Sequence, residues 1–405
     1  MDGDPAVEPE VDSFSLALPL PYRVAIITVL GIWAWGLNLH YLHLLKIDVP
    51  ALIRYPARPS QNSILHHHST YRLATLLTLP LVGSLLFFWL VTRGDRHAAL
   101  SWQILPQSYL LFLILCFVLP VKRMSRSGRL HFLSTLKRIS LGGLAEVQDG
   151  KFGDILLADV LTSYAKVLGD LFVSTCMLFS AKTTSTAKPD RGCGGAYLVP
   201  FIMSVPSIIR LRQCLIEYLR VRRNRTPTSG WGGQHLANAL KYSSAFPVIF
   251  LSALQRGYDP KTFHMTEAGL FRLWLFSVFV NSFYSFYWDV AKDWDLSLFS
   301  SSRDRNDPEH PYGLRRHRYF HAQEMYYTAI AIDLLLRCTW SFKLSPHLDH
   351  FNDLEGGIFL MELMEVVRRW MWIFFRVETE WVRNNRGPAP DDILLGEFGG
   401  KLDED

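Results

Sequence analysis

Long apolar blocks alternate with short polar connectors along the whole chain. The blocks lie at about 22–45, 72–91, 104–121, 154–180, 195–219, 235–254, 268–290, 321–342 and 355–382. Blocks of about 17 to 25 residues are long enough to cross the apolar interior of a bilayer as helices. The pattern predicts an all-α fold, a polytopic integral membrane helical bundle with about nine to ten transmembrane helices.

Charge in the connectors predicts which side of the membrane each one faces. The connectors at 220–225 and 303–318 are rich in arginine and are separated by two predicted spans, so the positive-inside rule places both in the cytosol. The connectors at 255–267 and 343–354 then face the lumen or the exterior. A shorter amphipathic segment, 130–144, is either a tenth span or a helix along the interface. The orientation of the first third of the chain therefore stays open.

Composition and segment chemistry divide the chain further. Hydrophobic residues make up 49% of it and charged residues 20%, as expected of a membrane protein. The first residues are acidic where a signal peptide would be basic. We predict a disordered acidic tail at 1–21, N-terminal transmembrane helices at 22–150, a second transmembrane region at 151–398, whose bounds and transport role come from the resemblance described below, and an acidic C-terminal tail at 399–405.

Several function classes are disfavoured. Most cysteines lie in apolar segments without a C-x-x-C spacing, so we expect buried thiols rather than a disulfide framework. These are Cys116, Cys176, Cys214 and Cys338, whereas Cys193 lies in a loop. The net charge of +5 is dispersed, unlike that of a nucleic-acid module. The histidine run 66–68 has no acidic cluster or nucleophile motif with it, and we interpret it as a polar loop. We expect no enzyme activity, no cofactor, no metal and no nucleic-acid partner.

Polar side chains inside the apolar segments are the main functional signal, because such groups are costly in lipid and usually face a bundle interior or a water-filled path. Asp159, Thr162 and Ser163 share one stripe of a predicted helix, and the stripe continues through Lys166 and Asp170. A hydrogen-bonded seam between helices is the alternative for the two hydroxyls.

Two further spans carry charge. Lys241 and Tyr242 lie a turn or two into their segment, where the lysine either faces the interior or extends to the interface. Asp289 and Asp293 are an i, i+4 pair of like charges, which is unfavourable unless a cation or a basic side chain lies between them.

The last two spans add three arginines. Arg337 shares a face with Asp333 and Trp340, and it either lines a path or forms a structural ion pair with Asp333. Arg368 and Arg369 cannot point in one direction, because successive helical residues rotate by about 100°. They face a central axis or form an interfacial basic cluster. Guanidinium and ammonium groups from separate spans indicate a multivalent oxyanion as the ligand.

Six blocks in the second half resemble the EXS-domain family. They are 158–163, 210–218, 238–243, 288–294, 333–340 and 365–378. The resemblance is closest to the fungal Erd members. It is strong over 152–398 and weaker through 36–58. It implies a ten-helix membrane protein that transports inorganic phosphate.

The resemblance also implies the residues of the phosphate path. They are Asp159, Thr162, Lys241, Tyr242, Asp289, Asp293, Arg337, Trp340, Arg368 and Arg369, and the polar stripe adds Ser163. Thr162 departs from the animal exporters, which have Asn there. No SPX domain precedes the first span, so sensing of inositol polyphosphates through that domain is not expected.

The implied role is the return of luminal phosphate from the Golgi to the cytosol, which supports glycosylation and the retention of Golgi and luminal ER proteins. The implied location is the Golgi membrane, with the endoplasmic reticulum and a homodimer left open. The alternative is a membrane adaptor that binds glycosyltransferase tails or coat components through its cytosolic connectors and carries no solute.

Overall fold

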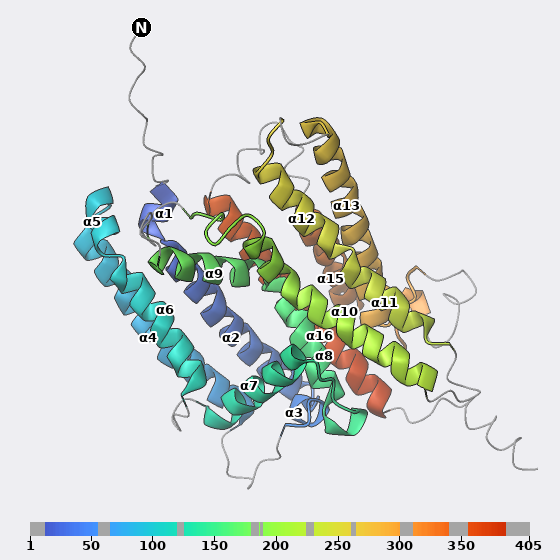
Figure 1. Cartoon of the computed structure of the whole chain (residues 1–405). Helices are drawn as coiled ribbons and strands as arrows, with labels where there is room; N and C mark the ends of the chain where they lie inside the picture. The colour runs from blue at the N-terminus through green and yellow to red at the C-terminus, as the bar shows by residue number, and fades with distance from the viewer. Residues whose placement is uncertain are drawn as a thin grey trace, which may run out of the picture.

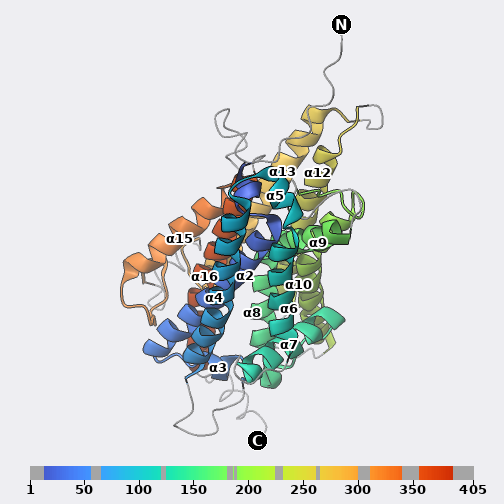
Figure 2. The same cartoon turned by 90° about the vertical axis from the view of Figure 1, so that its left-hand side faces the viewer.

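The chain folds into a bundle whose longer helices run from one end of the molecule to the other (Figures 1 and 2). The structure, a computed structural model, describes residues 13–55, 65–119, 125–179, 186, 189–223, 231–260, 265–299, 311–339 and 355–385. Every regular element in these residues is helical, so the predicted all-α class is confirmed. Helices α1 and α5 lie at one end of the bundle, and α3 and α7 lie at the other (Figure 2).

The elements follow the predicted blocks with several breaks. The first part contains α1 (Ser13–Ala17), α2 (Leu20–Leu44), α3 (Val49–Leu52), α4 (His66–Thr92), α5 (Arg96–Ser101), α6 (Ile104–Val118) and α7 (Arg126–Leu141). The second part contains η1 (Val147–Asp149), α8 (Lys151–Ser163), α9 (Ala165–Phe179), α10 (Leu198–Arg223), α11 (Gly233–Ser243), α12 (Ala245–Arg256), α13 (Glu267–Trp288), η2 (Asp289–Asp293), η3 (Pro311–Gly313), α15 (Gln323–Arg337) and α16 (Glu355–Asn385). The chain is already helical at Ser13, so the predicted disordered tail at 1–21 is too long.

Four of the described segments are long and apolar enough to cross a membrane. They are Leu20–Leu44, His66–Thr92, Arg96–Val118 and Leu198–Arg223. The protein is therefore a membrane protein, but the predicted count of nine to ten spans is not confirmed. Two of the other predicted blocks are divided into short helices, and the block in α16 carries many charged residues.

Two predicted spans are each broken into two helices. The block at 154–180 breaks at Tyr164, between α8 and α9, and the block at 235–254 breaks at Ser244, between α11 and α12. Tyr164 packs directly against Gly31 of α2, where an added Cβ would lie 2.0 Å from the tyrosine hydroxyl. The small residue on α2 therefore makes room for the break.

Helix α7 lies along one end of the bundle and does not cross it (Figures 1 and 2). Its 16 residues span about 24 Å, less than the bilayer interior of about 30 Å. Buried Arg129 donates from Nη1 to the backbone carbonyls of Cys116 and Leu119 and so caps the end of α6. Of the two interpretations of this amphipathic segment, the structure supports the interfacial helix.

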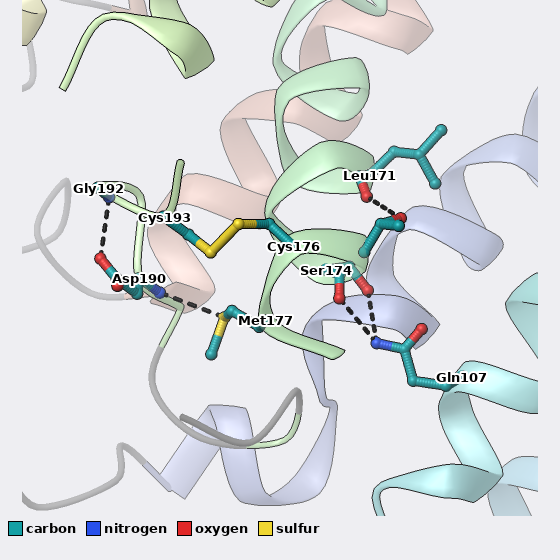
Figure 3. The surroundings of a disulfide bond; sticks show 9 residues. Gln107, Leu171, Ser174, Cys176, Met177, Asp190, Gly192 and Cys193 are labelled. Carbon is teal, nitrogen blue, oxygen red and sulfur yellow. Dashed lines mark hydrogen bonds between the residues drawn. A yellow bond between two sulfur atoms is a disulfide. The ribbon is translucent and has the colours of Figure 1, made fainter. Parts of the chain in front are cut away.

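A disulfide joins Cys176 of α9 to Cys193 in the loop before α10 (Figure 3). This pair corrects the expectation that Cys176 is a free buried thiol, whereas Cys116, Cys214 and Cys338 are free as expected. Cys176 and Cys193 are separated by 17 residues, a spacing that matches no cysteine motif and so did not predict the pair from the sequence.

The disulfide indicates which end of the bundle is luminal. Disulfides form in the oxidising compartments of the secretory pathway and are rare in the cytosol. The loop that contains Cys193 leads into the start of α10, and the opposite end of α10 carries Arg220, Arg222 and Arg223. We call the two ends luminal and cytosolic accordingly. This assignment agrees with the positive-inside argument and places α7 at the cytosolic end.

Mass spectrometry after alkylation tests the disulfide. Denatured protein should incorporate three alkyl groups without reductant, on Cys116, Cys214 and Cys338, and five after reduction. Replacing Cys193 by Ser should lower the unfolding temperature in detergent, because a cross-link over a loop of this length is worth about 3 kcal/mol. Cys338→Ser is the matched control, with little expected change. Five reactive thiols without reductant would contradict the pairing.

Candidate functional site

A network of buried charges joins the helices of the second half, and Arg368 lies at its centre. The Arg368 side chain is 2% exposed. Nη1 donates to Asp333 of α15 at 3.1 Å and to Asp289 of η2 at 3.4 Å. Nε donates to Glu365, one turn earlier on α16, at 3.0 Å. One cation therefore binds three carboxylates on three elements.

Arg337 of α15 binds the same two aspartates. Its Nε donates to Asp333 at 3.2 Å, and its Nη2 donates to Asp289 Oδ2. Arg337 thus forms the ion pair with Asp333 that was one of the two interpretations, and it also reaches the predicted site residue Asp289. The two arginines and two aspartates form a compact, charge-balanced square.

Asp159 of α8 forms a second centre. It is 2% exposed and accepts hydrogen bonds on Oδ1 from Arg210 Nε, at 2.7 Å, and from the hydroxyl of Tyr242. Arg210 also donates to Gln213 at 2.6 Å. Arg210 was not among the site residues predicted from the sequence, although an arginine within the apolar block 195–219 was the available signal.

Arg369 is bound differently from its neighbours. It is 7% exposed. Its Nε donates to Ser163 at 2.9 Å and its Nη2 to Thr162 at 3.3 Å, while its guanidinium stacks over Trp372 at 4.5 Å. Within the described residues, no carboxylate lies within ion-pair distance of it. The two hydroxyls thus form the predicted seam between helices. Both accept from the Arg369 cation, and the Ser163 hydroxyl in turn donates to Glu365 at 2.7 Å.

Lys241 of α11 is also incompletely bound. Its side chain is 8% exposed, which excludes the interpretation that it extends to the interface. Its ammonium lies 3.6 Å from Asp293 Oδ2, too far for a hydrogen bond, and rests against the rings of Tyr242 and Trp288. Asp289 and Asp293 therefore have separate cationic partners rather than one shared cation.

The backbone is interrupted beside several of these side chains, whereas Arg210 and the α16 arginines lie in unbroken helices. Asp289 and Asp293 begin and end a π-helical turn, closed by the bond from Trp294 N to Asp289 O. Ser163 precedes the break between α8 and α9, Tyr242 precedes the break between α11 and α12, and Arg337 ends α15. π-helical turns and broken helices in membranes frequently mark binding sites, because irregular backbone is tolerated where it is buried in protein or lines a cavity.

Not every acceptor in the network has a hydrogen-bond donor in the described part of the chain. Asp289 Oδ1 and Asp293 Oδ2 are buried acceptors without a hydrogen-bond donor among the described residues. The cavity of about 510 Å³ elsewhere in the molecule, between α4 and α7, is lined by none of the residues above.

Other predicted groups lie elsewhere. Lys166 is exposed on α9 and is not an interior cation. The break at Tyr164 also separates Asp170 from the stripe, and Asp170 instead lies 3.9 Å from Arg191 in the luminal loop. Trp340 lies outside the described residues. The histidine run 66–68 begins α4 rather than forming a loop, and no metal-binding cluster is found in the described part of the chain.

Comparison with known proteins gives the same picture over nearly the whole chain. The EXS family model matches residues 18–382, so it includes the N-terminal helices as well as the predicted transport domain. Protein ERD1 homolog 2 of Schizosaccharomyces pombe is 29% identical over 91% of this chain and 98% of its own length. Protein ERD1 homolog 1 of the same yeast is 30% identical over 92% and 93%. Solute carrier family 53 member 1 of Mus pahari is 28% identical over 67% of this chain and 38% of that protein.

Neutralising Asp159 tests the role of the buried charges in stability. Asp159→Asn should destabilise the protein by about 3 to 5 kcal/mol, because it leaves the Arg210 guanidinium buried without its anion. The matched control is Glu146→Gln, which removes an exposed partner of Arg220 and should cost less than about 1 kcal/mol. Unfolding temperatures in detergent measure both. Equal shifts would contradict the assigned pairing.

Proposed function

This chain belongs to the EXS family, and on that premise we propose that it transports inorganic phosphate from the Golgi lumen to the cytosol. Return of phosphate released by glycosylation would support the retention of Golgi and ER resident proteins. The relatives named ERD1 homologs and the solute carrier relative support the secretory location and the transport class. The site residues are those that the sequence analysis assigned, with Arg210, Asp333 and Glu365 as supporting groups.

The observation that carries the proposal is the environment of Arg369. A guanidinium has five N–H donors, and Arg369 uses two of its nitrogens on neutral hydroxyls. Burial of a cation without an anionic partner is costly. A phosphate oxygen would supply that anion and accept paired hydrogen bonds from the planar fork.

Unpaired acceptors near the arginine suit phosphate in its protonated forms. Asp289 lies within electrostatic range of Arg369, and its Oδ1 accepts no hydrogen bond in the described residues. Asp293 Oδ2 likewise has only the distant Lys241 ammonium. Hydrogen phosphate carries both acceptor oxygens for the cations and P–OH donors for these carboxylates. Sulfate has no such donors at neutral pH.

The charge balance of the network constrains how phosphate enters. Within the described residues, five cations of the network face five carboxylates, and Arg376, which lies 3.9 Å from Asp293 Oδ1, is itself paired with Glu380. The cations are Arg210, Lys241, Arg337, Arg368 and Arg369, and the carboxylates are those of Asp159, Asp289, Asp293, Asp333 and Glu365. An added anion must therefore replace a carboxylate on its guanidinium or arrive with a proton. We favour exchange on Arg337 and Arg368 as the breaks in α8–α9 and α11–α12 let the helices separate.

Phosphate flux into liposomes tests the role of Arg369. Purified protein should carry labelled phosphate faster than empty vesicles do, and Arg369→Gln should reduce that flux at least tenfold, because the anion loses its unpaired cation. Arg383→Gln is the matched control: it lies on the same helix, half-exposed beside Asp295, and should keep full flux. Equal unfolding temperatures of the two variants show that the loss is not a folding defect.

Full flux in Arg369→Gln, or no flux above empty vesicles for the native chain, would contradict the proposal. The same variants separate it from the adaptor alternative. In cells, Arg369→Gln should impair the retention of Golgi enzymes if transport underlies retention. An adaptor would keep normal retention with this variant and lose it when charges in the cytosolic connectors are reversed.

Anion competition tests the predicted donor and acceptor pattern. Unlabelled phosphate should inhibit uptake of labelled phosphate at least tenfold more strongly than sulfate does. Sulfate has no O–H donor for the buried Asp289 carboxylate, so this carboxylate would repel sulfate and stay without a hydrogen bond. Asp289→Asn supplies an amide N–H donor in place of a carboxylate acceptor, so it should reduce the preference for phosphate over sulfate. Equal inhibition by both anions in the native protein would contradict the assignment of Asp289.

A further inference from the structure

A cavity of about 510 Å³ opens between the starts of α4 and α7. None of the residues that line it belongs to the charge network. Its lining includes the side chains of Tyr55, His68, Ser69, Arg72, Ser125 and Arg126. Its volume is within the usual range of about 300 to 1,000 Å³ for small-ligand sites. The cavity is therefore large enough for more than a single inorganic ion.

The chemistry of the lining is basic and hydroxylated. None of the described residues that line the cavity is acidic. Arg126 is exposed and has no ion-pair partner within the described part of the chain. This differs from the central network, in which most cations are bound to carboxylates. Arginine forks with neighbouring hydroxyls are the groups that bind phosphate monoesters.

Packing around the cavity holds several of these groups in place. The Ser69 hydroxyl of α4 donates to Ser125 Oγ at 3.0 Å, which links the starts of the two helices. The ring of Tyr55 packs edge-on against His66 and His131, with centroids 4.9 and 5.3 Å away. These contacts orient the lining hydroxyls before any ligand binds.

The cavity lies where a lipid headgroup would be. It is at the cytosolic end, beside α7, which lies along the interface (Figure 2). Leu130 lines the cavity and is 45% exposed, and Leu141 at the far end of α7 is 77% exposed. An amphipathic basic helix with exposed leucines is typical of an element that contacts acyl chains and anionic headgroups together.

We propose that the cavity between α4 and α7 binds a phosphate monoester at the cytosolic membrane surface, presented by a phosphoinositide headgroup. The volume favours an inositol ring with its phosphate over a free phosphate ion. Arg126 and Arg72 bind the monoester oxygens, Tyr55 and the serines bind ring hydroxyls or phosphate, and Leu130 contacts the glycerol end of the lipid. This site is separate from the proposed transport path.

Binding of short-chain phosphatidylinositol 4-phosphate to the full-length purified protein tests the proposal. Thermophoresis should give saturable binding that weakens at least tenfold in Arg126→Gln and in the double variant with Arg72→Gln. Lys137→Gln is the matched control, since it removes an exposed charge from the same helix outside the cavity and should stay within twofold of native. Arg126→Lys should bind more tightly than Arg126→Gln but less tightly than the native protein, because lysine keeps the positive charge but lacks the paired N–H donors of the guanidinium.

Further probes identify the source of the phosphate. Short-chain phosphatidylcholine should not bind. If inorganic phosphate alone binds with the same dependence on Arg126, the site is a phosphate site and the headgroup assignment is overturned. Equal loss in Arg126→Gln and Lys137→Gln, or no loss in either, overturns the site itself. Arg369→Gln should leave headgroup binding unchanged, so failure here is distinguishable from failure of the transport proposal.

Discussion

The burial of Arg368 beside Arg369 on α16 is the constraint on which the rest of the structure depends. Removing a guanidinium from water costs several kcal/mol unless anions or other acceptors replace the lost hydration. Arg368 obtains them from η2, α15 and its own helix, and Arg369 obtains hydroxyls from α8. Helices distant in sequence are thereby held around one point on α16.

Such a network is better suited to specificity than to stability. Apolar side chains of similar volume would often hold a bundle as well as buried ion pairs do. The presence of buried ion pairs inside a membrane protein therefore suggests a function. The π-helical turn at Asp289–Asp293 contains two of the charged residues, and the breaks at Tyr164 and Ser244 lie beside Ser163 and Tyr242. The breaks between helices are points where the bundle can bend, and they lie next to the carboxylates that an anion would displace.

The two ends of the bundle are built differently. At the luminal end, Arg23 of α2 and Arg191 of the disulfide-bonded loop both bind Glu355 at the start of α16, each at 2.6 Å. These contacts tie the first turn of α16 to α2 and to the loop. At the cytosolic end, Arg129 fixes α7 to α6, and the basic cavity beside it stays open.

The sequence by itself determined the helical membrane class, the family and most of the residues that meet at the centre, because apolar block length and charge within a block are local properties of the chain. Tertiary structure decided which carboxylate pairs with which cation, that Arg210 belongs to the set, that Lys166 and Asp170 do not, and that α7 stays at the interface. It also decided the Cys176–Cys193 bond. Each of these outcomes depends on the depth and rotation of helices relative to one another, and those quantities are fixed only when distant segments pack together.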